Sequence, residues 1–220
     1  MNKFVSNYLL RKYNVISFDI FDTLIERKVS KPSDIFYLTG KKILGEESAE
    51  TFRDVRIKAE EKARSLKISN EVNLDEIYDN IKIYSKSQLE LLKEKEIETE
   101  ISNCIPRKGM FLFYNKCLKL NKKLLFISDM YLSSQVIKEI LKNCGYLEIT
   151  NLFISNEFGH SKKDGSLFDI ALKKTNVKRK ECIHIGDSYK ADFLGARKEG
   201  LSALLVLRKN LIRNKVKTFF

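Results

Sequence analysis

Four polar clusters in this sequence each come after a short apolar run that has the composition of a buried β-strand. They are Asp19 after residues 15–18, Ser128-Asp129 after 124–127, Lys162-Lys163 beyond 151–154, and Asp187 with Asp192 after 182–185. The carboxyl ends of parallel strands share one edge of a sheet, where ligands bind. An ionised carboxylate is costly to bury there without a partner or a metal. The convergence of the four clusters therefore predicts a functional site.

The residue types in these clusters suit metal-assisted phosphoryl transfer. Asp19 and Asp187 supply the hard oxygen ligands that Mg²⁺ prefers, and Mg²⁺ would offset phosphate charge while a carboxylate attacks. Asp19 is then the predicted nucleophile and would form an aspartyl-phosphate. The Ser128-Asp129 segment is predicted to bind the phosphate near a helix start. Lys162 or Lys163 would balance the carboxylates, and the spacing favours Lys162.

The elements that must hold these clusters alternate between strand and helix in the second half of the chain. Strands that are apolar throughout and separated by helices indicate a parallel sheet covered on both faces. The first strand needs this sheet as a partner, so residues 27–105 are interpreted as an insertion after it. That block looks helical almost throughout, with no convincing strand. Its helices are predicted around residues 35–38, 52–59, 74–83 and 89–101.

Composition narrows the function classes. The chain has 220 residues and a net charge of +12, but its lysines are spread evenly and no nucleic-acid motif is present. Nucleic acid is therefore a disfavoured partner, and the excess charge favours anionic small molecules. No apolar run is long enough for a membrane span or a secretion signal, so a cytosolic location is expected. Oligomeric state is not indicated by any of these features.

The cysteines give no evidence of a disulfide framework or a zinc site. Cys104, Cys117, Cys144 and Cys182 are widely separated, and none of them forms a C-x-x-C pair. We expect reduced and mostly buried thiols.

Together the four clusters resemble the motifs of the haloacid dehalogenase (HAD) superfamily of hydrolases. The matching segments are Phe18 to Leu24, Phe126 to Asp129, Lys162 six residues before Phe168, and Gly186 to Asp192. Order and spacing agree over residues 14–26 and 106–207. The resemblance implies a Rossmann-like core (residues 1–26 and 106–220), a Mg²⁺ site and a helical cap (residues 27–105). The segments 128–131 and 184–187 are also similar to HAD proteins found with glycosyltransferases in surface-polysaccharide pathways.

One position departs from the pattern that this resemblance implies. HAD phosphatases usually carry a second Asp, the general acid and base, two residues after the nucleophile, and here Phe21 stands in that place. Asp22, one residue further on, is the candidate replacement. The implied metal ligands are Asp19, the backbone carbonyl of Phe21, Asp187 and Asp192, although Asp192 could instead orient Lys162.

Other polar residues have less specific interpretations. His184 lies inside a predicted core strand and is interpreted as a buried, hydrogen-bonded histidine. In the predicted cap, Tyr37, Arg53, Arg56 and Arg64 are candidates for substrate contact. A charge on the helix surface is the favoured interpretation for each of the three arginines.

The predicted function is a Mg²⁺-dependent phosphatase that acts on a small phosphorylated metabolite, with the cap closing over the substrate. A sugar phosphate or another polysaccharide precursor is the expected substrate. Two alternatives remain open: hydrolysis of a carbon–halogen or carbon–phosphorus bond by the same Asp, and a non-catalytic binding module that has lost the acid.

Overall fold

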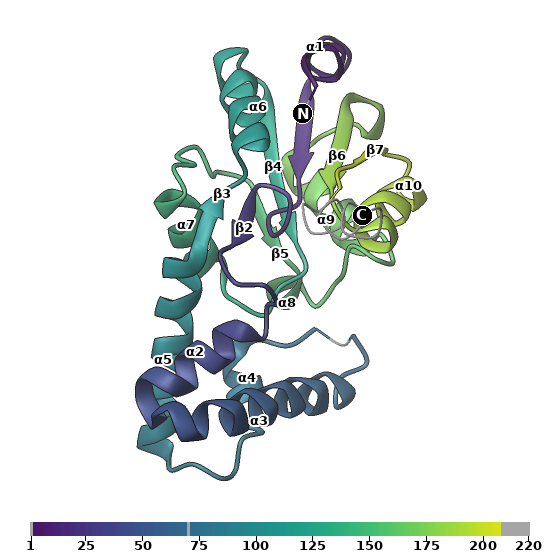
Figure 1. The fold of residues 1–220 in the computed structure, drawn as a ribbon. Helices are drawn as coiled ribbons and strands as arrows, with labels where there is room; N and C mark the ends of the chain where they lie inside the picture. The colour runs from purple at the N-terminus through teal and green to yellow at the C-terminus, as the bar shows by residue number, and fades with distance from the viewer. Residues whose placement is uncertain (1, 70, 208–220) are drawn as a thin grey trace, which may run out of the picture.

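A five-stranded parallel sheet forms the centre of the structure, a computed structural model that describes residues 2–69 and 71–207. The strands stand in the order β5-β4-β1-β6-β7 (Figure 1). Their bounds are Val15–Phe18 (β1), Lys123–Ser128 (β4), Leu152–Ile154 (β5), Cys182–Gly186 (β6) and Ser202–Leu205 (β7). This sheet confirms the predicted α/β fold class. The predicted core runs to residue 220, and residues 208–220 lie outside the described part of the chain.

Hydrophobic cores cover both faces of the sheet because successive side chains of a strand point to opposite faces. Ile16 and Phe18 pack into a core with α1, α6 and α7. Val15, Leu125 and Ile127 pack into a second core with α9 and α10. These helices are Lys3–Lys12 (α1), Lys108–Lys119 (α6), Ser134–Asn143 (α7), Ser166–Thr175 (α9) and Gly195–Lys198 (α10).

Three short helical segments complete the core. They are α8 (Ser155–Phe158), a 3₁₀ turn (Arg179–Glu181) and a π-helical turn (Tyr189–Leu194) that leads directly into α10. The π-helical turn follows β6 at the carboxyl edge of the sheet. It therefore carries Asp192 to the same edge as Asp19.

The insertion after β1 forms a helical cap (Figure 1). Its helices are Asp34–Leu44 (α2), Glu46–Ser65 (α3), Leu74–Tyr78 (α4) and Lys86–Asn103 (α5). The third is shorter than predicted, because it ends at Tyr78 and does not continue to Ile83. The helix α5 lies against α7 of the core, so the cap has a side-by-side contact with the sheet-covering layer.

A small antiparallel ribbon joins the cap to the core. It pairs β2 (Ile25–Arg27) with β3 (Cys104–Pro106), and the predicted domain boundaries fall within these two strands. The prediction that the block up to residue 105 contains no strand is wrong at its end. Strands of three residues are too short to show a period in the sequence.

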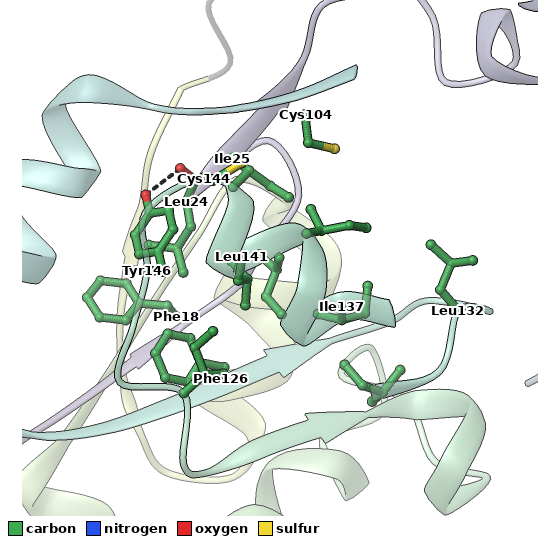
Figure 2. Packing of buried hydrophobic residues seen from close by; sticks show 14 of the residues in the cluster. Phe18, Leu24, Ile25, Cys104, Phe126, Leu132, Ile137, Leu141, Cys144 and Tyr146 are labelled. Carbon is green, nitrogen blue, oxygen red and sulfur yellow. Dashed lines mark hydrogen bonds between the residues drawn. The ribbon is translucent and has the colours of Figure 1, made fainter. Parts of the chain in front are cut away.

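The ribbon is anchored by buried apolar residues of the core (Figure 2). Leu24, Ile25 and Cys104 belong to the same cluster as Phe18 and Leu141. The Tyr146 hydroxyl donates a hydrogen bond of 2.6 Å to the Leu24 carbonyl. The ribbon is thus continuous with the core that supports β1.

Two predictions from composition can be compared with this structure. All four cysteines are buried free thiols, as expected. Within residues 2–69 and 71–207, none of the helices has both the length and the apolar character that a membrane span requires. The cytosolic location stays a prediction.

Candidate active site

Asp19 lies directly beyond β1 at the carboxyl edge of the sheet and is only 5% exposed. Its backbone N–H donates to the Ile185 carbonyl at 2.9 Å, so the chain still follows β6 at this residue. The chain then turns sharply, because the N–H groups of Leu24 and Ile25 both donate to the Ile20 carbonyl. Asp19 is thereby held at the end of β1.

The turn after Asp19 also carries a second hydrogen bond to its carboxylate. Thr23 is fully buried, and its hydroxyl donates to Asp19 Oδ2 at 2.8 Å. Asp22 adopts a left-handed backbone with φ of 58°, a conformation that Asp tolerates better than most residues. Its carbonyl accepts a hydrogen bond from the Arg107 guanidinium. This turn holds the residues that flank the predicted nucleophile.

Lys162 provides the positive charge of the site. Its ammonium donates to Asp19 Oδ1 and to Asp192 Oδ1, at 2.6 Å in each case, and its side chain is 4% exposed. Its backbone N–H donates to Asp129 Oδ1 at 2.9 Å. Lys163 is exposed. The structure therefore brings Lys162, and not its neighbour, to the carboxylates.

The surroundings shift the pKa values of these groups in opposite directions. Burial raises the pKa of Asp19 to about 7, against the opposing attraction of Lys162. Burial disfavours the ammonium of Lys162, but the carboxylates of Asp19 and Asp192 outweigh it and raise its pKa. Burial also opposes ionisation of Asp192, yet Lys162 and His184 hold the pKa of that carboxyl well below its usual range. A protonated Lys162 thus faces an ionised Asp192.

Behind Lys162, a buried chain of polar groups orients Asp192. His184 Nε2 lies 3.1 Å from Asp192 Oδ1, and His184 Nδ1 lies 2.8 Å from the Ser17 hydroxyl. Burial lowers the pKa of His184, so the neutral ring donates to Asp192 and accepts from Ser17. A Cβ on Gly186 would lie 2.2 Å from the Asp192 side chain, which explains the glycine there. The interpretation of His184 as a hydrogen-bonded core residue agrees with this geometry.

Three carboxylates are grouped closely enough to hold a cation. One oxygen each from Asp19, Asp187 and Asp192 lies within 4.8 Å of the other two. Asp192 already accepts from Lys162 and His184 on Oδ1 and from the Ser188 N–H on Oδ2. A carboxylate has about four lone-pair positions, so one remains. This set of hard oxygens fits Mg²⁺, which is satisfied by one or two protein carboxylates and several waters.

The Ser128-Asp129 segment is fixed by the start of α8. Ser128 ends β4 and is buried, whereas the Asp129 side chain is exposed. The Met130 N–H donates to the Ser155 hydroxyl at 3.1 Å. That amide is therefore unavailable to a phosphate, and the Ser128 hydroxyl remains the better donor.

Core and cap together line an open cavity of about 630 Å³. The core contributes all the predicted site residues, namely Asp19, Phe21, Asp22, Ser128, Asp129, Lys162, Asp187 and Asp192. The cap and the ribbon contribute Arg27, Phe36, Ile57, Glu60 and Arg64, among others. The volume leaves ample room beside the carboxylates for an organic group attached to a phosphate.

The predicted cap contacts have different outcomes. Arg64 lines the cavity, and Tyr37 and Arg53 are not among the residues that line it. The favoured interpretation of Arg56 as a surface charge is wrong. Its side chain is fully buried and forms two hydrogen bonds to Glu96, of 2.9 and 2.8 Å. Tyr131 of the core lies against it, with the guanidinium 4.8 Å from the ring centre.

Some residues of the cavity carry no signal that would have distinguished them in the sequence. Arg27, on β2, stacks on the Phe21 ring at 4.3 Å and pairs with Glu100 at 2.6 Å. Glu60 lies on the cavity wall between two arginines of α3. The spacing Glu60–Arg64 is a possible helical i,i+4 pair, but such pairs are common on solvated helices.

The fold and site define a class of protein: a parallel α/β sheet with a buried Asp–Lys–Asp cluster and an inserted group of helices. The haloacid dehalogenase-like hydrolase family matches residues 13–200. The chain belongs to this family. This match confirms the resemblance to the HAD superfamily that the sequence motifs indicated.

Two curated relatives share the family description. The chain is 31% identical over 75 residues to haloacid dehalogenase-like hydrolase domain-containing protein 3 of Danio rerio, and 33% identical over 91 residues to that of Bos taurus. These matches cover 34% and 41% of the chain. They cover 31% and 35% of the relatives, so the chain spans about a third of their length.

Solved structures agree on the fold over most of the chain. L-2-haloacid dehalogenase from Xanthobacter autotrophicus has a TM-score of 0.64 at 11% identity, covering 94% of this chain and 84% of that one. The HAD-family protein YfnB from Bacillus subtilis, in a structure bound to magnesium, has a TM-score of 0.60 at 17% identity. It covers 89% of both chains.

Proposed function

We propose that this chain is a Mg²⁺-dependent phosphatase that hydrolyses a phosphate monoester through an aspartyl-phosphate on Asp19. The observation that carries the proposal is the position of the Lys162 ammonium, 2.6 Å from both Asp19 and Asp192, with Asp187 close by. An ammonium in this position stabilises negative charge on a transferring phosphoryl group. Asp19, the Phe21 carbonyl, Asp187 and Asp192 are the proposed ligands of Mg²⁺, which when bound would offset the phosphate charge.

The chain's own residues account for the two steps. Asp19 attacks phosphorus, so that a bond from its carboxylate oxygen to phosphorus forms and the ester P–O bond breaks. Lys162 and the hydroxyls of Thr23 and Ser128 hold the carboxylate and the phosphoryl oxygens in place. Water then attacks the same phosphorus, which restores the Asp19 carboxylate and releases phosphate.

The leaving oxygen needs a proton in the first step, and water must lose one in the second. We assign this transfer to Asp22, since Phe21 has no ionisable group and Asp22 lines the same cavity. General acid–base assistance is typically worth about 10²–10⁴-fold in rate. Asp22→Asn should therefore lower kcat by about that factor while it leaves metal binding intact.

Hydrolysis of a carbon–halogen bond is the second candidate. Phe21 is an aromatic residue that lines the same cavity as Asp19, and several of the similar structures are of dehalogenases. The phosphatase proposal is stronger because three carboxylates group around the Lys162 ammonium, and a bound divalent cation would offset the negative charge that remains. Carbon–phosphorus cleavage and a non-catalytic binding role are the remaining alternatives.

A turnover panel tests the proposal. Release of phosphate from p-nitrophenyl phosphate and from a set of sugar phosphates is measured with Mg²⁺ and with EDTA, beside release of chloride from 2-chloropropionate. Phosphate release that needs both Mg²⁺ and Asp19 is expected. Asp19→Asn should abolish it, whereas Asp79→Asn, at an exposed cap residue, should not. Chloride release, or phosphate release that persists in Asp19→Asn, would overturn the proposal.

We also propose a sugar phosphate or another polysaccharide precursor as the physiological substrate, on the sequence similarity of residues 128–131 and 184–187 described above. The same panel ranks these compounds against other metabolites.

A further inference from the structure

The helix α3 contributes an ion pair, Glu60 and Arg64, to the lining of the cavity. The Glu60 carboxylate accepts hydrogen bonds from Arg64 on Oε1, at 3.0 Å from Nε and 2.7 Å from Nη2. Both side chains line the cavity that contains Asp19 and Lys162. Any group attached to the phosphate that reaches the cap would meet this pair.

A buried support holds the pair in place. Glu60 Oε2 accepts from Arg56 Nη1 at 3.1 Å, and Arg56 also clamps Glu96. The Arg56 guanidinium lies 4.4 Å from the ring centre of Phe36. Buried ion pairs contribute little net stability because desolvation offsets their attraction. A fixed orientation of the cavity wall is therefore the more direct benefit of this network.

The positive charges that line the cavity are already balanced by carboxylates. Within the described part of the chain, the cavity is lined by six carboxylates (Asp19, Asp22, Glu60, Asp129, Asp187 and Asp192) and three cations (Arg27, Arg64 and Lys162). Arg27 pairs with Glu100, Arg64 with Glu60, and Lys162 with Asp19. With a divalent cation bound, six carboxylates would face five positive charges, so the cavity lining would hold no excess of positive charge. A second anionic group on the substrate would therefore have to compete with the carboxylates that already pair with these cations.

We propose that the substrate is a phosphate monoester whose remaining part is uncharged and carries hydroxyl groups. This inference rests on the proposed phosphatase function and narrows it. Glu60 offers acceptors and Arg64 offers donors, a combination that suits hydroxyls and adds no net charge to attract a carboxylate or a second phosphate. Phe36 and Ile57 line the same cavity and provide apolar surface for the carbon skeleton of such a substrate. Sugar and polyol monophosphates fit these requirements.

Two matched pairs of probes test the inference on the unmodified protein. Glycerol 3-phosphate and 3-phosphoglycerate differ only by a hydroxymethyl group in place of a carboxylate. Glucose 1-phosphate and glucuronate 1-phosphate differ in the same way. In each pair kcat/KM for the neutral member should be at least about tenfold higher. Equal or faster hydrolysis of the carboxylates would overturn the inference.

Variants on α3 test whether the ion pair causes the selectivity. Glu60→Gln removes one negative charge and keeps an acceptor, so the selectivity ratio should shift towards the carboxylates by about fivefold. Arg64→Gln should shift it the other way. Glu61→Gln changes an exposed neighbour outside the cavity lining and serves as the matched control. If the selectivity ratio stays unchanged in both Glu60→Gln and Arg64→Gln, the ion pair does not cause the selectivity and the inference is overturned.

Failure of the two proposals looks different. Absence of turnover for all monoesters contradicts the phosphatase function alone. Dissociation constants for the same probe pairs, measured by calorimetry with Mg²⁺, then still decide the inference. Turnover with a preference for the carboxylates contradicts the inference and leaves the phosphatase function standing.

Discussion

Gly195 is the first residue of α10, and it packs against the backbone of Lys162. We predict that this close packing positions the Lys162 side chain. A Cβ at this residue would lie 1.9 Å from the Lys162 carbonyl oxygen and 2.9 Å from its carbonyl carbon. The backbone of Gly195 is right-handed helical, with φ of −61° and ψ of −46°, so alanine is conformationally allowed. The change Gly195→Ala therefore tests close approach alone, without backbone strain.

The size of the effect follows from the overlap. Ordinary contact begins at 3.4 Å, so α10 and the Lys162 backbone must separate by about 1.5 Å. The Lys162 ammonium holds two carboxylates at 2.6 Å, and a misplacement of about 1 Å at a catalytic group can cost about 10²-fold in rate. We expect a fall of about a hundredfold in kcat. Overpacking should cost about 1–3 kcal/mol, reduced by about 1 kcal/mol of helix propensity.

The assay is Mg²⁺-dependent hydrolysis of p-nitrophenyl phosphate, with urea unfolding of the same samples. Arg197→Ala, at an exposed residue of α10, is the control and should change neither quantity. Because Gly195→Ala is expected to act through Lys162, it should add little to the loss caused by Lys162→Met in the double variant. A Gly195→Ala protein with full activity and a higher free energy of unfolding would refute the reasoning.

Two further predictions concern stability and reactivity. Arg56→Met leaves Glu96 buried without its ion-pair partner, so the free energy of unfolding in urea should fall by about 3–5 kcal/mol. Addition of Glu96→Leu should restore more than half of it, and a single-variant loss under about 1 kcal/mol would contradict this account. Burial raises the pKa of Cys117 and of Cys182 to about 12, which leaves a thiolate fraction of about 10⁻⁴ at pH 8. Ellman's reagent should therefore label these thiols only after unfolding, and a tenfold rise in thiolate from pH 8 to 9 should not make the native protein reactive. Rapid labelling of the native protein would contradict this.

The part of the site that the sequence predicted depends on strand ends. Asp19, Ser128 and Asp187 follow apolar runs directly, and parallel strands bring their carboxyl ends together whatever the helices do. Lys162 has no strand of its own, and its position follows from the loop after α8 and from Gly195. Its distance from the carboxylates is a property of packing that spacing alone does not give.

The cap was harder to predict, and Arg56 shows why. The buried residues of α3 are Ala49, Phe52, Arg56, Ala59 and Ala63, which recur at helical spacing on one face. Arg56 occupies a position in this apolar stripe, so the helical period itself indicated that it was buried. The interpretation of Arg56 as a surface residue gave more weight to its charge than to its place in this stripe. A charged residue in an apolar stripe should be expected to have a buried partner, here Glu96.

The contacts of Phe21 bear both on the attachment of the cap and on which residue transfers the proton. Its ring packs under the Arg27 guanidinium, and Arg27 pairs with Glu100 near the end of α5. The residue two places after the proposed nucleophile therefore contacts the ribbon through which the cap is attached. An Asp in its place would lose the ring contact and lie next to Arg27, which would hold it ionised and favour an ion pair over proton transfer. The same contact that ties the ribbon to the turn after Asp19 thus favours the proposal that proton transfer belongs to another residue of that turn, Asp22.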